Sequence, residues 1–309
     1  MYMYLPIALT SVNYLVVMGL GLGVGLLSGL FGVGGGFLMT PLLMMIGIPP
    51  TIAAATDANQ IVAASASGTF SHWRLGNVDF KMGLYLLIGG FVGGAAGVQV
   101  IKILRASGGA DFLIKMTYVV MLGLVGSFMF VESLNAMRKS KKADPAAAPA
   151  AAPKQKKGGF FAALPMQTYF EKSGVTHSAL VPLVLGTFVG VLAAIMGVGG
   201  GFLMVPVMIY MLRMPMHVVV GTSLFQILFT CIEVTFLQAY SNHTVDFILA
   251  IILLVGSVFG AQIGTALGKK LHGDQLKILL SIIVLAVTVK IVFELVLEPS
   301  ILLSYAGGH

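Results

Sequence analysis

The sequence predicts an all-α integral membrane protein with about ten hydrophobic segments, arranged as two inverted-topology repeats of five. Of its 309 residues, 58% are hydrophobic and only 9% are charged, and the mean hydropathy is +0.98. This composition leaves too few polar side chains for a water-facing surface. Several apolar runs reach or approach the roughly 20 residues that a membrane-spanning helix needs. In addition, the run FGVGGGFLMTP at 31–41 returns as MGVGGGFLMVP at 196–206.

Each half of the chain contains five hydrophobic segments, which are expected to be helical because lipid offers backbone groups no other partner. In the first half they lie near residues 14–31, 37–48, 51–71, 83–103 and 112–131, and in the second near 178–196, 202–212, 216–240, 247–268 and 275–297. The second segment of each half follows a glycine run and is too short to cross a hydrocarbon core of about 30 Å. We therefore expect a broken or re-entrant helix pair in each repeat.

The repeat extends well beyond the glycine runs. Gln60 corresponds to Gln226, and the sequence VDF occurs both at 78–80 and at 245–247. The offset between the halves stays within 165 to 167 residues, which indicates a duplication. We divide the chain into a first transmembrane repeat, a linker and a second transmembrane repeat, at residues 1–132, 133–176 and 177–309.

The linker is rich in alanine and proline, is strongly basic, and cannot bury enough apolar surface to fold by itself. An odd number of segments per repeat makes the two repeats enter the membrane from opposite sides. A cytoplasmic linker places 14 of the 18 Lys and Arg residues inside, as the positive-inside rule requires. We expect a multi-pass protein of the cell inner (cytoplasmic) membrane with both termini outside. The basic linker favours contact with anionic lipids, and no nucleic acid partner is expected.

The glycine runs predict an anion site. A helix that begins at GGGFLM presents free N–H groups with a partial positive charge, and glycine lets a ligand approach the backbone closely. Helix packing is the structural alternative, and we favour it for the G-x-x-x-G pairs Gly93/Gly97 and Gly260/Gly264. The residues that we predict to bind substrate through these two helix starts are Gly34, Gly35, Gly36, Phe37, Gly199, Gly200, Gly201 and Phe202.

The third segment of each half supplies polar side chains. Thr56 and Gln60 are four residues apart, as are Thr222 and Gln226, so each pair shares one helix face. Together with Ser223 they are predicted to donate hydrogen bonds to the substrate. Hydrogen bonding between helices is the structural alternative.

Asp57 and Glu233 are acidic residues on these same helices, where a charge is costly and by default indicates function. A carboxylate would repel an anionic substrate, whereas a neutral carboxyl group can donate a hydrogen bond and carry a coupling proton. We predict a coupling role for both residues. A tether to a neighbouring helix, or a position at the aqueous edge, is the alternative.

The segments GLFGVGGGFLMTPLL and GVGGGFLMVPVM, the latter followed by VVVGTSLFQI, resemble the TauE/SafE-type sulfite exporter family of membrane permeases. The resemblance covers both repeats and implies transport of small sulfur-containing anions. The family's GTS stands at residues 221–223, but its counterpart in the first half reads Ala55, Thr56, Asp57. The two half-sites are therefore chemically unequal.

Together these observations predict a secondary transporter that moves sulfite, a sulfonate or thiosulfate by alternating access, with proton coupling as an option. The alternatives are an anion channel, or a carrier of another small anion or of a cation that uses Asp57 and Glu233. An enzyme is not expected, because no nucleophile lies within reach of a base. Cys231 is the only cysteine, and no nucleotide motif or metal-ligand cluster stands out, so neither a cofactor nor a metal is expected.

Overall fold

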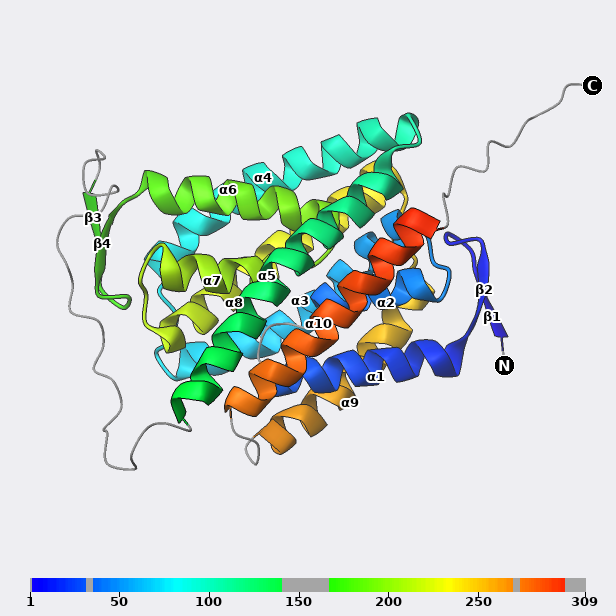
Figure 1. The fold of residues 1–309 in the computed structure, drawn as a ribbon. Coiled ribbons are helices and arrows are strands. Elements are labelled where there is room, and N and C mark those ends of the chain that lie inside the picture. Colours follow the sequence, from blue (N-terminus) through cyan, green and yellow to red (C-terminus); the bar gives the residue numbers. More distant parts are fainter. Residues whose placement is uncertain (1, 32–35, 141–166, 269–272, 298–309) are drawn as a thin grey trace, which may run out of the picture.

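The computed structural model describes residues 2–31, 36–140, 167–268 and 273–297, and these form a bundle of ten α-helices with a β-hairpin at each end (Figure 1). The first half consists of β1 (Tyr2–Leu5), β2 (Thr10–Asn13), α1 (Tyr14–Phe31), α2 (Gly36–Met45), α3 (Pro50–Arg74), α4 (Phe80–Ala106) and α5 (Ala110–Ser140). The second half repeats this order with β3 (Gln167–Phe170), β4 (Val175–Ser178), α6 (Leu180–Met196), α7 (Gly201–Tyr210), α8 (Met216–Leu237), α9 (Phe247–Gly268) and α10 (Gly273–Leu297). A π-helical turn, Gln238–Asn242, continues α8.

The predicted helices are confirmed, including the two short ones. Helices α2 and α7 contain ten residues each, and at 1.5 Å per residue they extend only about 15 Å. Among the described helices, four are long and apolar enough to span a membrane, and they comprise Phe80–Ala106, Ala110–Phe128, His217–Asn242 and Phe247–Gly264.

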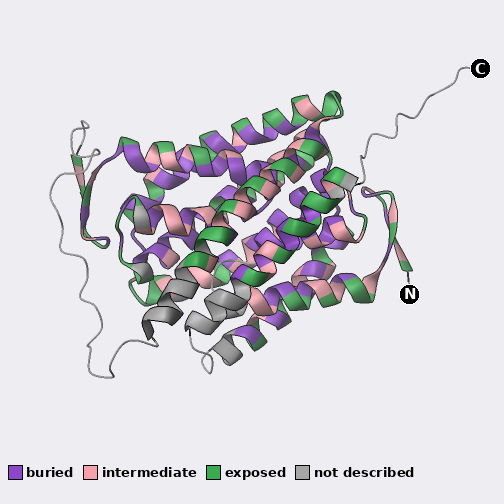
Figure 2. Cartoon of the chain, viewed as in Figure 1, coloured by how far each residue is buried: buried purple, intermediate pink, exposed green. Residues whose placement is uncertain are grey.

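The surface of the bundle is apolar where the helices face outward. Figure 2 shows exposed residues along α1, α4, α5 and α10, and large exposed side chains there include Leu15, Leu124 and Val296. The first half of α3, by contrast, is almost continuously buried. This distribution suits a protein whose outer faces contact lipid and whose centre is protein.

The expectation of an all-α chain missed the two antiparallel hairpins, β1–β2 and β3–β4. Each strand has only four residues, and an isolated hairpin of this size is marginal in water. The hairpins persist because their turns are bonded to helices of the other half, as described below.

The predicted linker, 133–176, is partly regular structure at both of its ends. Helix α5 continues to Ser140, and strand β3 begins at Gln167. The basic Ala/Pro-rich stretch at 141–166 lies outside the described residues.

The two halves interleave. Helix α1 packs along α9 and α4 packs along α6, so that the first helix of each half lies against the fourth helix of the other. In the same way α3 packs on α8 and α5 packs on α10. A Cβ atom at Gly93 would lie 2.0 Å from the Thr187 carbonyl oxygen, and one at Gly260 would lie 2.1 Å from that of Leu22. The packing role predicted for the G-x-x-x-G pairs is therefore confirmed.

Replacing Gly93 with alanine is expected to destabilise the protein by about 2 kcal/mol, as overpacked sites typically do, because the added methyl group would collide with the backbone of α6. Gly23→Ala is the matched control, since a Cβ atom there has nothing within 4 Å. Melting temperatures in detergent would compare the two variants. Equal stability would contradict this account of the α4–α6 contact.

Candidate functional site

The break between α6 and α7 depends on glycine for steric reasons. Gly197, Gly199 and Gly200 have φ angles of 71°, 68° and 77°, in the left-handed region that disfavours other residues. A Cβ atom at Gly197 would also lie 2.0 Å from the Ala54 carbonyl oxygen on α3. Helix α7 then begins at Gly201, so its first amide groups have no acceptor within the helix.

The corresponding start of α2 lies beside it. Gly36 is the first residue of α2, and a Cβ atom there would meet the Ile61 side chain at 2.2 Å. The rings of Phe37 and Phe202 are buried and stacked, with centroids 4.5 Å apart and an interplanar angle of 13°. The structure thus brings the two predicted helix starts together. Gly34 and Gly35 lie outside the described residues.

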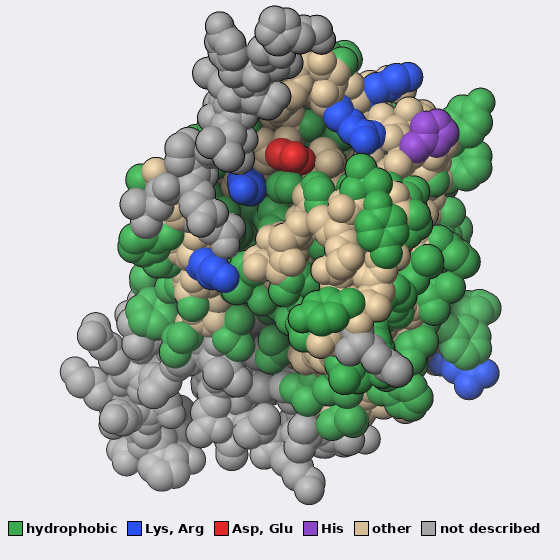
Figure 3. Space-filling view, turned by 90° about the vertical axis from the view of Figure 1, so that its right-hand side faces the viewer, with side chains coloured by type: hydrophobic (Ala, Val, Ile, Leu, Met, Phe, Trp, Pro, Cys, Tyr) green, Lys and Arg blue, Asp and Glu red, His purple; other side chains and the backbone are tan. Residues whose placement is uncertain are grey.

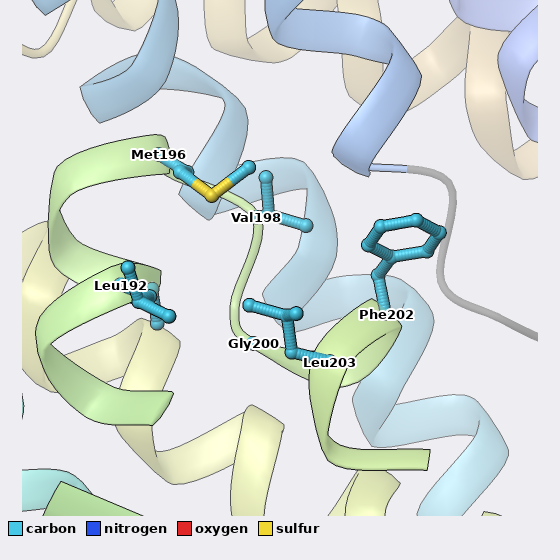
Figure 4. Close-up of a pocket in the computed structure, with 7 residues that line it drawn as sticks. Leu192, Met196, Val198, Gly200, Phe202 and Leu203 are labelled. Carbon is cyan, nitrogen blue, oxygen red and sulfur yellow. The ribbon is translucent and has the colours of Figure 1, made fainter. Parts of the chain in front are cut away.

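A small pocket adjoins the α6–α7 break (Figure 4). Its side chains are apolar, so polar contacts to a ligand at this point would have to come from main-chain groups. The residues that line it are Leu192, Ala193, Met196, Val198, Gly200, Phe202 and Leu203.

The two predicted threonines have partners in the opposite half. The Asp246 backbone N–H donates to Thr56 Oγ1 at 3.1 Å, and the Asp79 backbone N–H donates to Thr222 Oγ1 at 3.0 Å. All four residues are buried. These hydroxyl groups therefore hold the two halves together, and substrate contact by Thr56 and Thr222 stays a prediction.

The predicted glutamines are almost completely inaccessible, with exposed fractions of 3% for Gln60 and 0% for Gln226. Gln226 Nε2 donates to Thr230 Oγ1 at 2.9 Å. Within the described ranges, the side-chain carbonyl oxygens of Gln60 and Gln226 have no hydrogen-bond partner. Ser223, also buried, donates to the Val220 carbonyl oxygen of its own helix at 3.1 Å.

The two acidic residues occupy different surroundings. Asp57 is fully buried against the start of α2, where its Oδ2 accepts a hydrogen bond from Thr40 Oγ1 at 2.9 Å. Glu233 is half-buried and faces α4, where a Cβ atom at Gly94 would lie 2.9 Å from its Oε2. One oxygen of each group, Asp57 Oδ1 and Glu233 Oε2, is buried without a partner in the described part of the chain.

Sequence reasoning missed Thr40 and Tyr118. Tyr118, a fully buried residue of α5, donates its hydroxyl proton to the carbonyl oxygen of Met196, the last residue of α6. The repeat contained a signal for Thr40: its counterpart in the second half is Val205, where the counterpart of Asp57 is Ser223. The threonine and the aspartate that depart from the repeat are thus bonded to each other.

Polar atoms without a partner gather on the two central helices. Of the buried side-chain oxygen and nitrogen atoms in the described residues that lack a hydrogen bond, all but one belong to α3 or α8. Apart from Thr10, they come from Asp57, Asn59, Gln60, Ser65, Thr69, His72, Gln226, Glu233 and Thr235. Buried polar groups are normally bonded. These polar atoms on α3 and α8, which we call the polar seam, are therefore the candidate functional site.

Apolar outer helices, two broken helices whose starts meet, and a buried polar seam are features of a multi-pass membrane protein of the transporter class. The sequence profile described as "Sulfite exporter TauE/SafE" matches residues 17–291. The chain therefore belongs to the TauE/SafE sulfite exporter family, a family of membrane transporters.

Two relatives from Bacillus subtilis (strain 168) are similar over most of their length. "Probable membrane transporter protein YunE" is 27% identical over 296 residues, which cover 91% of this chain and 98% of the relative. "Probable membrane transporter protein YjnA" is 28% identical over 274 residues, 88% of this chain and 97% of the relative. "Sulfite exporter TauE/SafE family protein 1" of Arabidopsis thaliana is 32% identical over 110 residues, 35% of this chain and 24% of the relative. No solved structure matches the chain significantly.

Replacing Thr222 with valine is expected to lower the free energy of unfolding by about 1 to 3 kcal/mol, because the buried Asp79 N–H would lose its acceptor. Thr222→Ser keeps the hydroxyl group and should remain close to the unchanged protein. Melting in detergent without substrate isolates this structural effect. A valine variant as stable as the serine variant would show that the hydrogen bond does not hold the halves together.

Proposed function

We propose that this chain is a secondary transporter that moves a small sulfur-containing anion, such as sulfite, a sulfonate or thiosulfate, across the cytoplasmic membrane by alternating access. The observation that carries the proposal is the polar seam on α3 and α8, the helices against which α2 and α7 pack, with the starts of α2 and α7 paired through Phe37 and Phe202. The family's description supports a sulfur anion as substrate.

The arrangement of the halves supports an inverted repeat. Hairpins β1–β2 and β3–β4 lie at opposite ends of the bundle, and α1 and α6 start from those opposite ends (Figure 1). Helices α2 and α7 would then enter from opposite sides as half-helices that meet near the midplane, where transporters of this kind bind substrate. In this topology the linker is cytoplasmic, close to anionic lipids, and both termini are outside.

The proposed site combines main-chain and side-chain donors. The amide groups at the starts of α2 and α7 supply the positive ends of two helix dipoles, and glycine leaves them accessible to a ligand. The side chains that we assign to the substrate are Thr56, Gln60, Thr222, Ser223 and Gln226. All five are nearly inaccessible, so the described conformation is closed and an anion enters only when one end opens.

Asp57 is our candidate for the coupling proton. A charged carboxylate at this position would repel the anion, and protonation removes that charge. Thr40 holds Oδ2, which leaves Oδ1 free to take the proton. Glu233, which faces α4, is the second candidate.

Transport is tested with purified protein in proteoliposomes, by measuring sulfite, sulfoacetate and thiosulfate flux with and without an imposed proton gradient. We expect saturable flux of at least one of these anions. Gln226→Leu should lower that flux at least about tenfold, because it removes a buried polar group from the site. Gln99→Leu, on an exposed position of α4, should leave it unchanged. Flux that does not saturate would indicate a channel, and failure of all three anions would remove the substrate assignment.

Asp57→Asn should abolish the response of transport to a proton gradient while downhill flux continues. The asparagine carbonyl oxygen can still accept the hydrogen bond from Thr40, so only the ability to exchange a proton is lost. Asp111→Asn, at the start of α5, is the matched control, since its side chain accepts a bond from the Thr51 backbone elsewhere in the bundle. If transport by the Asp57→Asn variant still responds to the proton gradient, the coupling proton must be carried by a group other than Asp57.

A further inference from the structure

The aspartate of each VDF sequence bonds to three different elements. Asp79 is the N-cap residue of α4, and its Oδ1 accepts a hydrogen bond from the Met82 N–H at 3.0 Å. Its Oδ2 accepts from the backbone N–H and the hydroxyl group of Ser173, in the β3–β4 turn. Its own N–H donates to Thr222 on α8.

Asp246 makes the same bonds in the other half. Its Oδ1 accepts from the Leu249 N–H at 3.2 Å, at the start of α9. Its Oδ2 accepts from the Ile7 N–H at 3.2 Å, in the β1–β2 turn, and its own N–H donates to Thr56 on α3. Each aspartate therefore ties the fourth helix of its own half to the hairpin and the polar helix of the other half.

These two sets of bonds lie at opposite ends of the molecule. Each aspartate is bonded to the turn of one hairpin, and the hairpins occupy the two ends of the bundle (Figure 1). Figure 3 views the β1–β2 end, where basic side chains and an acidic one lie among hydrophobic side chains. Asp79 and Asp246 are themselves buried, with exposed fractions of 2% and 0%. With both sets of bonds made, as they are here, the polar atoms of the seam that lack a partner are buried.

The bonds also reach the proposed site. Thr56 precedes Asp57 in the chain, and Thr222 precedes Ser223. A movement of either hairpin that pulls on its aspartate is therefore transmitted to Thr56 or Thr222, which are themselves residues of the proposed site. Since each aspartate joins elements of both halves at one end of the bundle, we expect that opening one end stretches the bonds there while those at the other end persist.

We propose that Asp79 and Asp246 are positioning residues that hold the two hairpins as alternating gates: release of Asp246 from the β1–β2 turn opens that end, and release of Asp79 from the β3–β4 turn opens the other. The inference rests on the proposed transport function, but it concerns access and is independent of which anion moves.

Replacing either aspartate with asparagine tests the bond to the hairpin turn separately from the bond that caps the helix. Its carbonyl oxygen can still accept from the helix N–H, whereas its amide group cannot accept from the turn. A cysteine placed by Ser223→Cys in a Cys231→Ala background reports access to the site. The full-length protein is reconstituted in vesicles and labelled from either side with a membrane-impermeant maleimide.

We expect Asp246→Asn to raise the labelling rate about tenfold from the β1–β2 side only, and Asp79→Asn to do so from the β3–β4 side only, as expected for loss of a charge-assisted hydrogen bond. Asp111→Asn should change neither rate. Because a general loss of structure would increase labelling from both sides, the side preference distinguishes a gate from a merely structural bond. Equal labelling from both sides, a shared side, or no change in either variant would overturn the proposal.

If the asparagine variants do not reach the membrane, Asp79→Ser and Asp246→Ser test the same point, because serine also caps helices but is too short to reach the turn. Side-specific labelling in a protein that moves none of the three sulfur anions would support the gates and reject the substrate. Saturable flux of one of these anions without side-specific labelling would support the substrate and reject the gates.

Discussion

The fold depends on buried hydrogen bonds that cross between the two halves of the chain. Asp79 bonds to Thr222 and Ser173, and Asp246 bonds to Thr56 and Ile7, so each half completes the other. A buried carboxylate without partners would cost far more free energy than an exposed one. Neither aspartate can therefore be satisfied unless the halves interleave. This requirement fixes the hairpins at the ends of the bundle and places the polar helices α3 and α8 at its centre.

Glycine makes this interleaving possible. Gly93 and Gly260 let α4 approach α6, and α9 approach α1, until backbone lies against backbone. Inside lipid the hydrophobic effect does not drive helices together, so their association depends on van der Waals contact. Small residues allow that contact because the two backbones can approach closely. Gly36 and Gly199 likewise have no side chain, which lets the starts of α2 and α7 lie directly against the central helices α3 and α8. The polar atoms of α3 and α8 are then enclosed by closely packed helices, which leaves them buried but not all bonded.

Periodicity and repetition predicted the local features well, because segment length, glycine spacing and duplication are properties of contiguous sequence. They predicted the ten helices, including the two short ones, and the close helix packing at the G-x-x-x-G pairs. They missed the hairpins, whose stability comes from Asp79 and Asp246. They also could not assign the partners of Thr56 and Thr222, since those lie 190 and 143 residues away. Only the three-dimensional arrangement shows that these hydroxyl groups are already occupied by backbone donors.

The duplication distinguishes residues that occur in both halves from residues that occur in one half only. The VDF aspartates, their threonine partners and the two glutamines occur in both halves, so both halves contribute them to the symmetrical framework and to the proposed site. Asp57 and Thr40 occur in one half only, where Ser223 and Val205 are their counterparts, and they are bonded to each other. A second carboxylate at the position of Ser223 would bring two negative charges to the centre of the proposed anion site. A single carboxyl group that can be neutralised is compatible with binding an anion, so the asymmetry supports the proposal that Asp57 carries the coupling proton.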